Sequence, residues 1–201
     1  MSNTERALLS SAQRGNTQAF TQLVAAYQVR VFNLCNRMLG DRYEAEDAAQ
    51  ETFLRAYKAI KRYDLDRPFA TWLLTIASRY CIDQLRRRRL QTFSIEKFLE
   101  TGLADPAPGP EASLTRSEEQ NRMQELLHVL KPADRAAIVM RYWYEFSYEE
   151  IADALSMSVS AIKSRLHRAR KELALAWTKK TNPIPSQRVN LEKQRYESPA
   201  V

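Results

Sequence analysis

The sequence predicts an all-α protein made of two small helical domains joined by a proline-rich linker. Apolar residues recur at steps of three and four along most of the chain, and the alternation typical of strands persists nowhere. The helical periodicity fades once, near the middle, around a cluster of prolines. The length of 201 residues fits two such cores, because small domains cluster around roughly 100 residues.

The first domain is predicted over residues 1–92 as a helical bundle. Three amphipathic stretches predict its helices, at 20–39, at about 43–60 and from Pro68 onward. The pair Gly40-Asp41 separates the first helix from the second. The third helix has proline in its first turn, a position that tolerates the missing N–H.

A linker is predicted over residues 93–117, where the helical pattern is lost. Residues 105–110 hold three prolines and one glycine, a composition typical of an extended and partly stiff connection. The polar segment 179–201 contains three prolines and is expected to be a disordered tail.

The second domain is predicted over residues 118–178 and contains a helix-turn-helix. Ser147-Tyr-Glu-Glu150 has the form of a capping box, in which the serine and the glutamate each bond a backbone N–H at the start of a helix. A short helix follows, and residues 156–158 make a turn into a longer helix that begins near Val159. Two helices joined by about three residues are typical of this motif.

The second helix of this motif has a polar and basic outer face. At 100° per residue, Ile162 and Leu166 lie on the buried side. Such a helix can enter a DNA major groove, where its donors contact base edges and its cations neutralise phosphates. A solvated amphipathic helix with ordinary surface charge is the alternative. The outward residues proposed to read DNA are Ser160, Lys163, Ser164, His167 and Arg168.

The third helix of the first domain ends in four consecutive arginines, Arg86 to Arg89. One or two cations would complement the C-terminal end of the helix dipole, but four exceed that need. The aromatic residues Tyr63, Phe69 and Trp72 precede them, a combination suited to unstacked bases and phosphates. Phe69 and Trp72 also share the apolar stripe, so a role in the core is the alternative for each.

Motifs in both domains resemble those of bacterial sigma factors. Residues 47–57, Asp-Ala-Ala-Gln-Glu-Thr-Phe-Leu-Arg-Ala-Tyr, resemble the polymerase-docking helix of that family. Residues 67–73 and 82–87 resemble the promoter-melting region, and residues 162–170 are similar to the recognition helix. Because no third domain lies between the two, the resemblance is to the extracytoplasmic-function group of the sigma-70 family.

This resemblance implies a role for each set of residues. The acidic helix would dock on the clamp coiled coil of core RNA polymerase, through Glu46, Asp47, Gln50, Glu51, Phe53 and Leu54. The minus-ten promoter element would be held and melted by Tyr63, Phe69, Trp72, Arg79, Arg86, Arg87 and Arg88. The minus-thirty-five element would be read by the five outward residues of the recognition helix.

The resemblance also implies binding partners and a mode of regulation. It implies contact with the polymerase flap, a linker that threads toward the RNA exit path, and control by an anti-sigma factor in a stress or envelope response. Two residues depart from the family pattern. Arg79 replaces a frequent asparagine near the flipped base, which affects base preference, and Ser156 replaces a frequent glycine of the turn.

The charge of the chain suggests a polyanion as partner, and solubility alone is an equal alternative on composition. The net charge is +7, and residues 1–92 alone hold 15 basic and 9 acidic side chains. No apolar run approaches the roughly 20 residues of a membrane span, and the first residues lack the apolar centre of a signal peptide, so a cytoplasmic protein is expected.

Other classes of function have less support. A helix-turn-helix regulator that binds DNA alone, with residues 1–92 for oligomerisation or sensing, would explain the second domain equally well. The two histidines, His128 and His167, have no matching catalytic constellation, so neither an enzyme nor a cofactor or small-molecule substrate is expected. Cys35 and Cys81 lack metal-ligand spacing and are expected to be buried, inert thiols.

Overall fold

The structure is a computed structural model that describes residues 3–98 and 118–181. These residues form α-helices and one short 3-10 helix, without a strand among them, which confirms the all-α prediction. Most of the predicted linker, from residue 99, and most of the predicted tail, from residue 182, lie outside the described residues. No described helix is long and apolar enough to cross a membrane.

The N-terminal half begins with a helix that the periodicity did not predict. Its elements are α1 (Asn3–Gln13), α2 (Thr17–Leu39), α3 (Arg42–Ala59), η1 (Ile60–Arg62) and α4 (Phe69–Phe98). The side chain of Asn16 accepts from the N–H of Ala19 and caps α2, and Asp41 caps α3 through the N–H of Glu44. Gly40 ends α2 with a φ of 83°, a left-handed conformation that favours glycine.

The core of this half lies between α2, α3 and α4. The buried face of α3 consists mainly of the small residues Ala45, Ala48, Ala49 and Ala56, which let α3 approach α2 closely. The apolar residues expected on that face from the spacing in the sequence included Tyr57, which is instead 41% exposed. Both thiols are buried, and hydrogen bonding to Cys35 and desolvation raise the pKa of Cys81 well above its usual range.

The C-terminal half contains the predicted helix-turn-helix. Its helices are α5 (Glu118–Val129), α6 (Pro132–Trp143), α7 (Tyr148–Leu155) and α8 (Val159–Thr181). Ser147 accepts from the N–H of Glu150 at 3.0 Å, and the Glu150 carboxylate accepts from the N–H of Ser147 at 2.8 Å, so both halves of the capping box form. Ser156 ends α7 in the left-handed conformation, with a φ of 55°.

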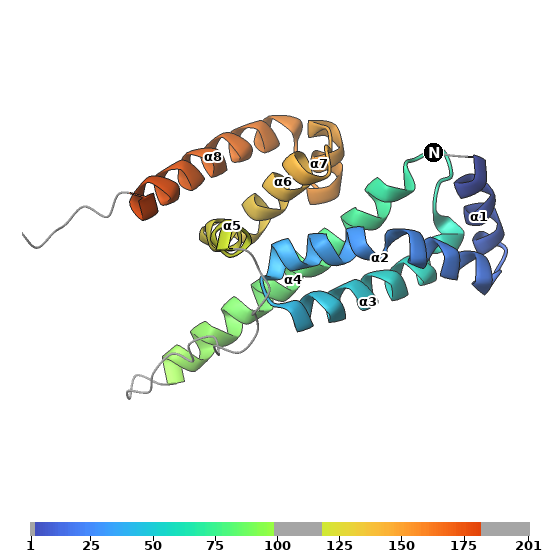
Figure 1. Cartoon of the computed structure of the whole chain (residues 1–201), viewed down its shortest axis with the longest axis horizontal. Helices are drawn as coiled ribbons and strands as arrows, with labels where there is room; N and C mark the ends of the chain where they lie inside the picture. Colours follow the sequence, from blue (N-terminus) through green and yellow to red (C-terminus); the bar gives the residue numbers. More distant parts are fainter. Residues whose placement is uncertain (1–2, 99–117, 182–201) are drawn as a thin grey trace, which may run out of the picture.

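The two halves pack against each other. Helices α5, α6 and α7 lie on one side of α2 and α4 (Figure 1), and contacts join α2 to α5 and α6, and α4 to α6 and α7. This packing brings the turn before α4 close to the helix-turn-helix.

Candidate nucleic-acid interface

The aromatic residues before and within α4 form a cluster beneath the turn at 63–69. The ring of Tyr63 lies 5.6 Å from that of Phe69 and 4.7 Å from that of Trp72, between ring centroids. Tyr63 is 5% exposed and Phe69 is 1% exposed, whereas Trp72 is only partly buried. The first two rings therefore support the turn from within, and only Trp72 reaches its surface.

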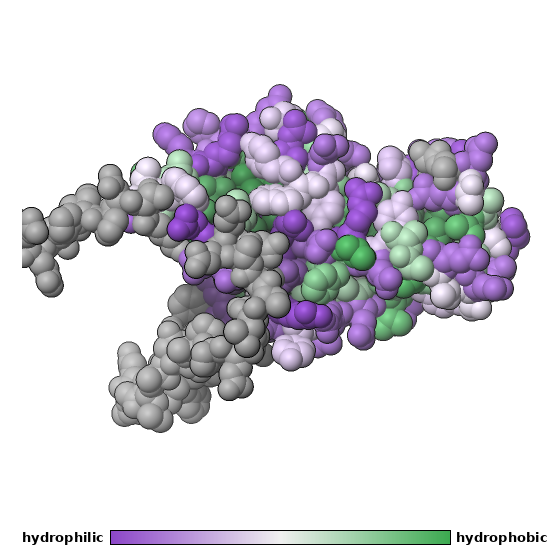
Figure 2. Space-filling model, viewed as in Figure 1, coloured by the Kyte–Doolittle hydropathy of each residue, from purple (hydrophilic) through white to green (hydrophobic). Residues whose placement is uncertain are grey.

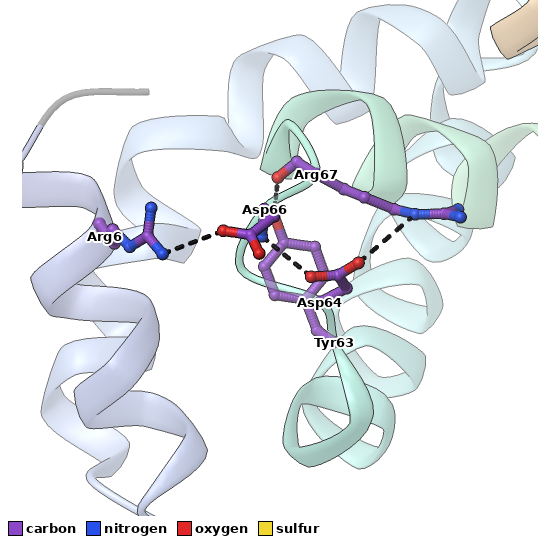
Figure 3. A network of polar contacts seen from close by, with 5 residues as sticks. All are labelled: Arg6, Tyr63, Asp64, Asp66 and Arg67. Atoms are coloured by element: carbon purple, nitrogen blue, oxygen red, sulfur yellow. Dashed lines mark hydrogen bonds and ion pairs between the residues drawn. The ribbon is translucent and has the colours of Figure 1, made fainter.

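Polar contacts hold the shape of the same turn (Figure 3). Arg6 of α1 pairs with Asp66 at 3.0 Å, and the N–H of Asp66 donates to the carboxylate of Asp64, also at 3.0 Å. The hydroxyl of Tyr63 donates to the carbonyl of Arg67, whose guanidinium lies 3.8 Å from Asp64. These contacts order the exposed charged side chains of the turn, which lies over the aromatic rings of Tyr63 and Phe69.

Helix α1 braces the turn through Gln13. The amide nitrogen of Gln13 donates to the carbonyls of Ile60, at 3.1 Å, and Tyr63, at 2.6 Å. Sequence reasoning did not find this helix, although Leu9 and Ala12, both buried, have helical spacing.

Arg79 of α4 extends across the boundary between the two halves. Its Nε donates to the carbonyl of Ala154 at 2.7 Å, and its Nη2 donates to that of Asp153 at 2.9 Å. About two helical turns before it, Thr71 donates to the carboxylate of Glu150 at 3.1 Å. A cavity of about 320 Å³, lined by residues that include Arg67, Trp72 and Thr75 of the N-terminal half, separates the turn from α7.

The arginine run does not form one continuous surface. Arg88 makes an ion pair with Glu44 of α3, and Arg86 lies 4.0 Å from Asp83, one turn earlier. Arg87 and Arg89 are exposed. Arg88 therefore joins α4 to the start of α3, a contact that links the predicted melting helix with the predicted docking helix.

The outer face of α3 combines carboxylates with an exposed leucine. Asp47, Gln50 and Leu54 are exposed, and Leu54 has 55% of its surface in solvent. Glu46 and Glu51 pair along the helix with Arg42 and Arg55, at 2.9 and 2.7 Å, and Phe53 is partly buried. In the view of Figure 2 the described surface is mainly hydrophilic, with hydrophobic residues in small separate areas.

The structure places the expected face of α8 in solvent. The side chains of Ile162 and Leu166 are buried, and the neighbouring Arg165 turns inward to pair with Asp134 of α6 at 2.6 Å. The hydroxyl of Ser158 accepts from the N–H of Ala161 at 3.2 Å and caps the helix. All five residues predicted to read DNA are exposed, namely Ser160, Lys163, Ser164, His167 and Arg168.

Comparison with known proteins decides the family. The family model of Sigma-70 region 2 matches residues 23–91, and that of Sigma-70, region 4 matches residues 120–173. The ECF RNA polymerase sigma factor SigW of Bacillus subtilis is 36% identical over 172 residues, which are 82% of this chain and 92% of SigW. The chain belongs to the extracytoplasmic-function sigma factors of the sigma-70 family.

Other relatives of this sigma factor agree. The RNA polymerase sigma factor CnrH of Cupriavidus metallidurans is 32% identical over 85% of this chain and 92% of its own length. The structure of CnrH in complex with the cytosolic domain of CnrY covers 87% of this chain and 97% of that one, with 28% identity and a TM-score of 0.64. A structure of the sigma factor RpoE from Bartonella quintana, 23% identical over 77% of this chain and 93% of that one, has the same fold with a TM-score of 0.61.

The family predicted from the motifs is therefore confirmed, and a stand-alone regulator is not favoured. A sigma factor is the DNA-recognition subunit of RNA polymerase, so the chain is not an enzyme. Its predicted contact residues form three separate surfaces, on α3, on the turn with α4, and on α8. Of these residues, Arg79 donates hydrogen bonds to the opposite half, to the carbonyls of Ala154 and Asp153.

Proposed function

We propose that this sigma factor docks on core RNA polymerase through α3, holds melted minus-ten DNA with the turn and α4, and reads the minus-thirty-five element with α8. The domains proposed for these tasks are 1–92 and 118–178, with a linker over 93–117 and a tail over 179–201, although α4 extends to Phe98 and α8 extends to Thr181. The observation that carries the proposal is the outward face of α8, because every residue assigned to it from the sequence is exposed on one capped helix.

For the upstream element, the chemistry of this face suits direct readout. Lys163 and Arg168 are exposed cations that can contact guanine edges or phosphates, and Ser164 and His167 add hydrogen-bonding groups between them. The partly buried ion pair of Arg165 with Asp134 fixes α8 to α6, and this contact holds the outward side chains in place.

For the minus-ten element, the geometry assigns different tasks to the aromatic residues. Tyr63 and Phe69 support the turn from inside, so we assign the contact with unstacked bases to the partly buried Trp72 and to Arg67 and Arg79. Arg86 and Arg87 would contact phosphates, because both are exposed on the helix beyond. The base preference at Arg79 would differ from that of asparagine, since a guanidinium only donates.

For binding to core polymerase, exposed Leu54 supplies an apolar anchor. Asp47 and Gln50, exposed beside it, supply a polar rim. The relative CnrH is in complex with the cytosolic domain of CnrY. We infer that an anti-sigma factor similarly holds this protein in the cytoplasm until a stress or envelope signal releases it.

The decisive experiment is initiation by core polymerase on templates with a randomised upstream element. The protein should select a defined minus-thirty-five sequence, and Lys163→Ala should relax one position of it at a cost of about 1–3 kcal/mol. Lys179→Ala, an exposed lysine near the other end of α8, is the matched control. Random initiation by the unmodified protein with core would refute the proposal.

A further inference from the structure

We propose that Tyr148 of α7 is a positioning residue for promoter recognition, whose ring holds the ammonium of Lys163 in place on the outward face of α8. The inference rests on the proposed function, because it concerns how one of the side chains that read the minus-thirty-five element is aimed. Tyr148 acts through Lys163 and not by a contact of its own with DNA.

The ring of Tyr148 and the side chain of Lys163 meet where α7 packs against α8. The Nζ atom of Lys163 lies over the ring, 5.7 Å from its centroid. This separation is within the roughly 6 Å at which the electron-rich face of an aromatic ring attracts a cation. Tyr148 is partly buried and Lys163 is exposed, so the ring supports the lysine from the protein side while the ammonium remains in solvent.

The ring is itself held by contacts around the start of α7. Tyr148 is the first residue of this helix, and the reciprocal bonds between Ser147 and Glu150 fix the backbone on either side of it. Arg141 of α6 lies over the same ring, with its Cζ 4.9 Å from the centroid, and its Nη1 donates to the carbonyl of Phe146 at 2.7 Å. Arg141 thereby joins the ring to the backbone of the turn that precedes α7.

A lysine side chain benefits from such a support when it must discriminate between bases. Its ammonium is a point charge on a flexible four-carbon stem, and fixing that stem costs rotamer entropy. The ring restricts the stem before DNA arrives, so less entropy is lost on binding. An ammonium has three N–H donors, and those turned away from the ring remain available for the acceptor atoms of a guanine edge.

The ring also leaves the charge of Lys163 available to DNA. A carboxylate partner would neutralise the cation, as Asp134 does for Arg165, two residues later in the same helix and 2.6 Å from that carboxylate. An uncharged ring attracts the ammonium without cancelling its attraction to a polyanion. Two neighbouring cations of α8 thus have different tasks, because Arg165 fixes the helix to α6 whereas Lys163 is held outward.

A double-mutant cycle between Tyr148 and Lys163 tests the assignment, in initiation by core polymerase and the full chain on templates with a randomised upstream element. Lys163→Ala should relax the preference at one base pair. At that same base pair Tyr148→Leu should lower the preference by about twofold to fivefold, the range expected for an exposed contact between a cation and a ring. The double variant should lose no more than Lys163→Ala, because the ring acts only through the lysine.

Further variants separate the aromatic face of Tyr148 from its hydroxyl and its volume. Tyr148→Phe keeps the aromatic face and should keep the preference. A phenylalanine whose ring carries three fluorine atoms, placed at position 148, keeps the shape of the ring but attracts cations less. It should reproduce the loss in Tyr148→Leu, and it replaces that variant if circular dichroism shows that the leucine disturbs the fold.

Two controls limit the effect to this pair. Tyr142→Leu, at an exposed tyrosine of α6, is the matched substitution and should leave promoter selection unchanged. The cycle between Tyr148→Leu and Arg168→Ala should be additive, since Arg168 is exposed farther along α8 and is assigned no contact with the ring.

Lys163→Ala by itself shows whether the proposed function holds at this residue. If it leaves the preference at every base pair unchanged, the proposed reading by Lys163 is wrong and the inference falls with it. If it relaxes one base pair but Tyr148→Leu does not, or if the two losses are additive, only the inference is overturned. A loss in Tyr148→Phe equal to that in Tyr148→Leu would assign the effect to a contact of the hydroxyl with DNA and would also overturn it.

Discussion

The guanidinium of Arg79 caps α7, with its Nε 2.7 Å from the carbonyl oxygen of Ala154. The same side chain is exposed and is also assigned to minus-ten DNA. Replacement of Arg79 should therefore affect both the packing of the two halves and the binding of DNA.

Arg79→Gln should loosen the unbound chain without improving its DNA binding. The substitution removes the cation from the end of α7, but it also removes a proposed contact to unstacked DNA. Small-angle scattering and fluorescence anisotropy measure the two effects. Arg87→Gln, an exposed arginine of the same helix, should leave compactness unchanged. An Arg79→Gln protein as compact as the parent would contradict the capping role.

A fall in pH should separate the two packed halves, because it protonates His128. Desolvation, followed by the charges of Arg135 and Arg88, lowers the pKa of His128 to about 4 from 6.5, while Glu125 acts in the opposite sense. The packed arrangement of the two halves therefore favours neutral imidazole. Its stabilisation is fully present above about pH 6.5 and is lost as the pH falls toward 4.

Scattering between pH 7.5 and 5 checks this prediction. The radius of gyration should rise as the pH falls, and His128→Gln should flatten the profile. His167→Gln, at the exposed histidine of α8, controls for the loss of an imidazole elsewhere. A pH profile unchanged by His128→Gln would assign the opening to other groups.

Arg165 and Arg168 should respond in opposite ways to replacement by alanine. Arg165 pairs with Asp134 in a largely buried site, so Arg165→Ala leaves that carboxylate without its cation and should cost about 1–3 kcal/mol of unfolding free energy. Exposed Arg168 should change stability by less than about 0.5 kcal/mol but weaken promoter selection. Urea unfolding and selection on randomised templates distinguish the two, and equal stability losses would refute the assignment.

Asp47→Lys combined with Leu54→Ser should weaken binding to core polymerase. Both residues are exposed, so the helix should keep its stability while the apolar anchor and its charged rim are lost. A loss of about tenfold in affinity corresponds to about 1.4 kcal/mol and is measurable by fluorescence titration. Leu175→Ser, at an exposed leucine of α8, is the control. Unchanged affinity for core would exclude this face of α3.

Local patterns were sufficient for much of the fold. The capping box at Ser147, the start of α8 and its outward face depend on residues within a few positions of one another, and the structure agrees with each. Ser156 is informative in a different way. Its position in the turn was predicted, but its left-handed conformation, which serine adopts at a cost, appears only in the backbone angles.

The remainder depends on contacts between distant segments. The pairing of Arg88 with Glu44 and the inward turn of Arg165 result from packing between helices, which periodicity does not encode. Phe69 had two open interpretations because an aromatic residue on an apolar stripe fits a core and a stacking surface equally well. Helix α1 was missed because its apolar pattern is short, with only Leu9 and Ala12 fully buried.

In the capping contacts between the halves, only the donor depends on the type of amino acid. At each helix end the donor is a particular side chain, Arg79 at the end of α7 or Gln124 of α5 at the end of α2, whereas the acceptor is a backbone carbonyl that every amino acid carries. Alanine scanning would therefore detect the loss of a donor side chain. It would not detect the acceptors at Ala154, Asp153 and Arg37, because alanine carries the same backbone carbonyl. For the same reason, sequences of related proteins would show no paired changes across this contact, because the acceptor positions can vary without altering the bond.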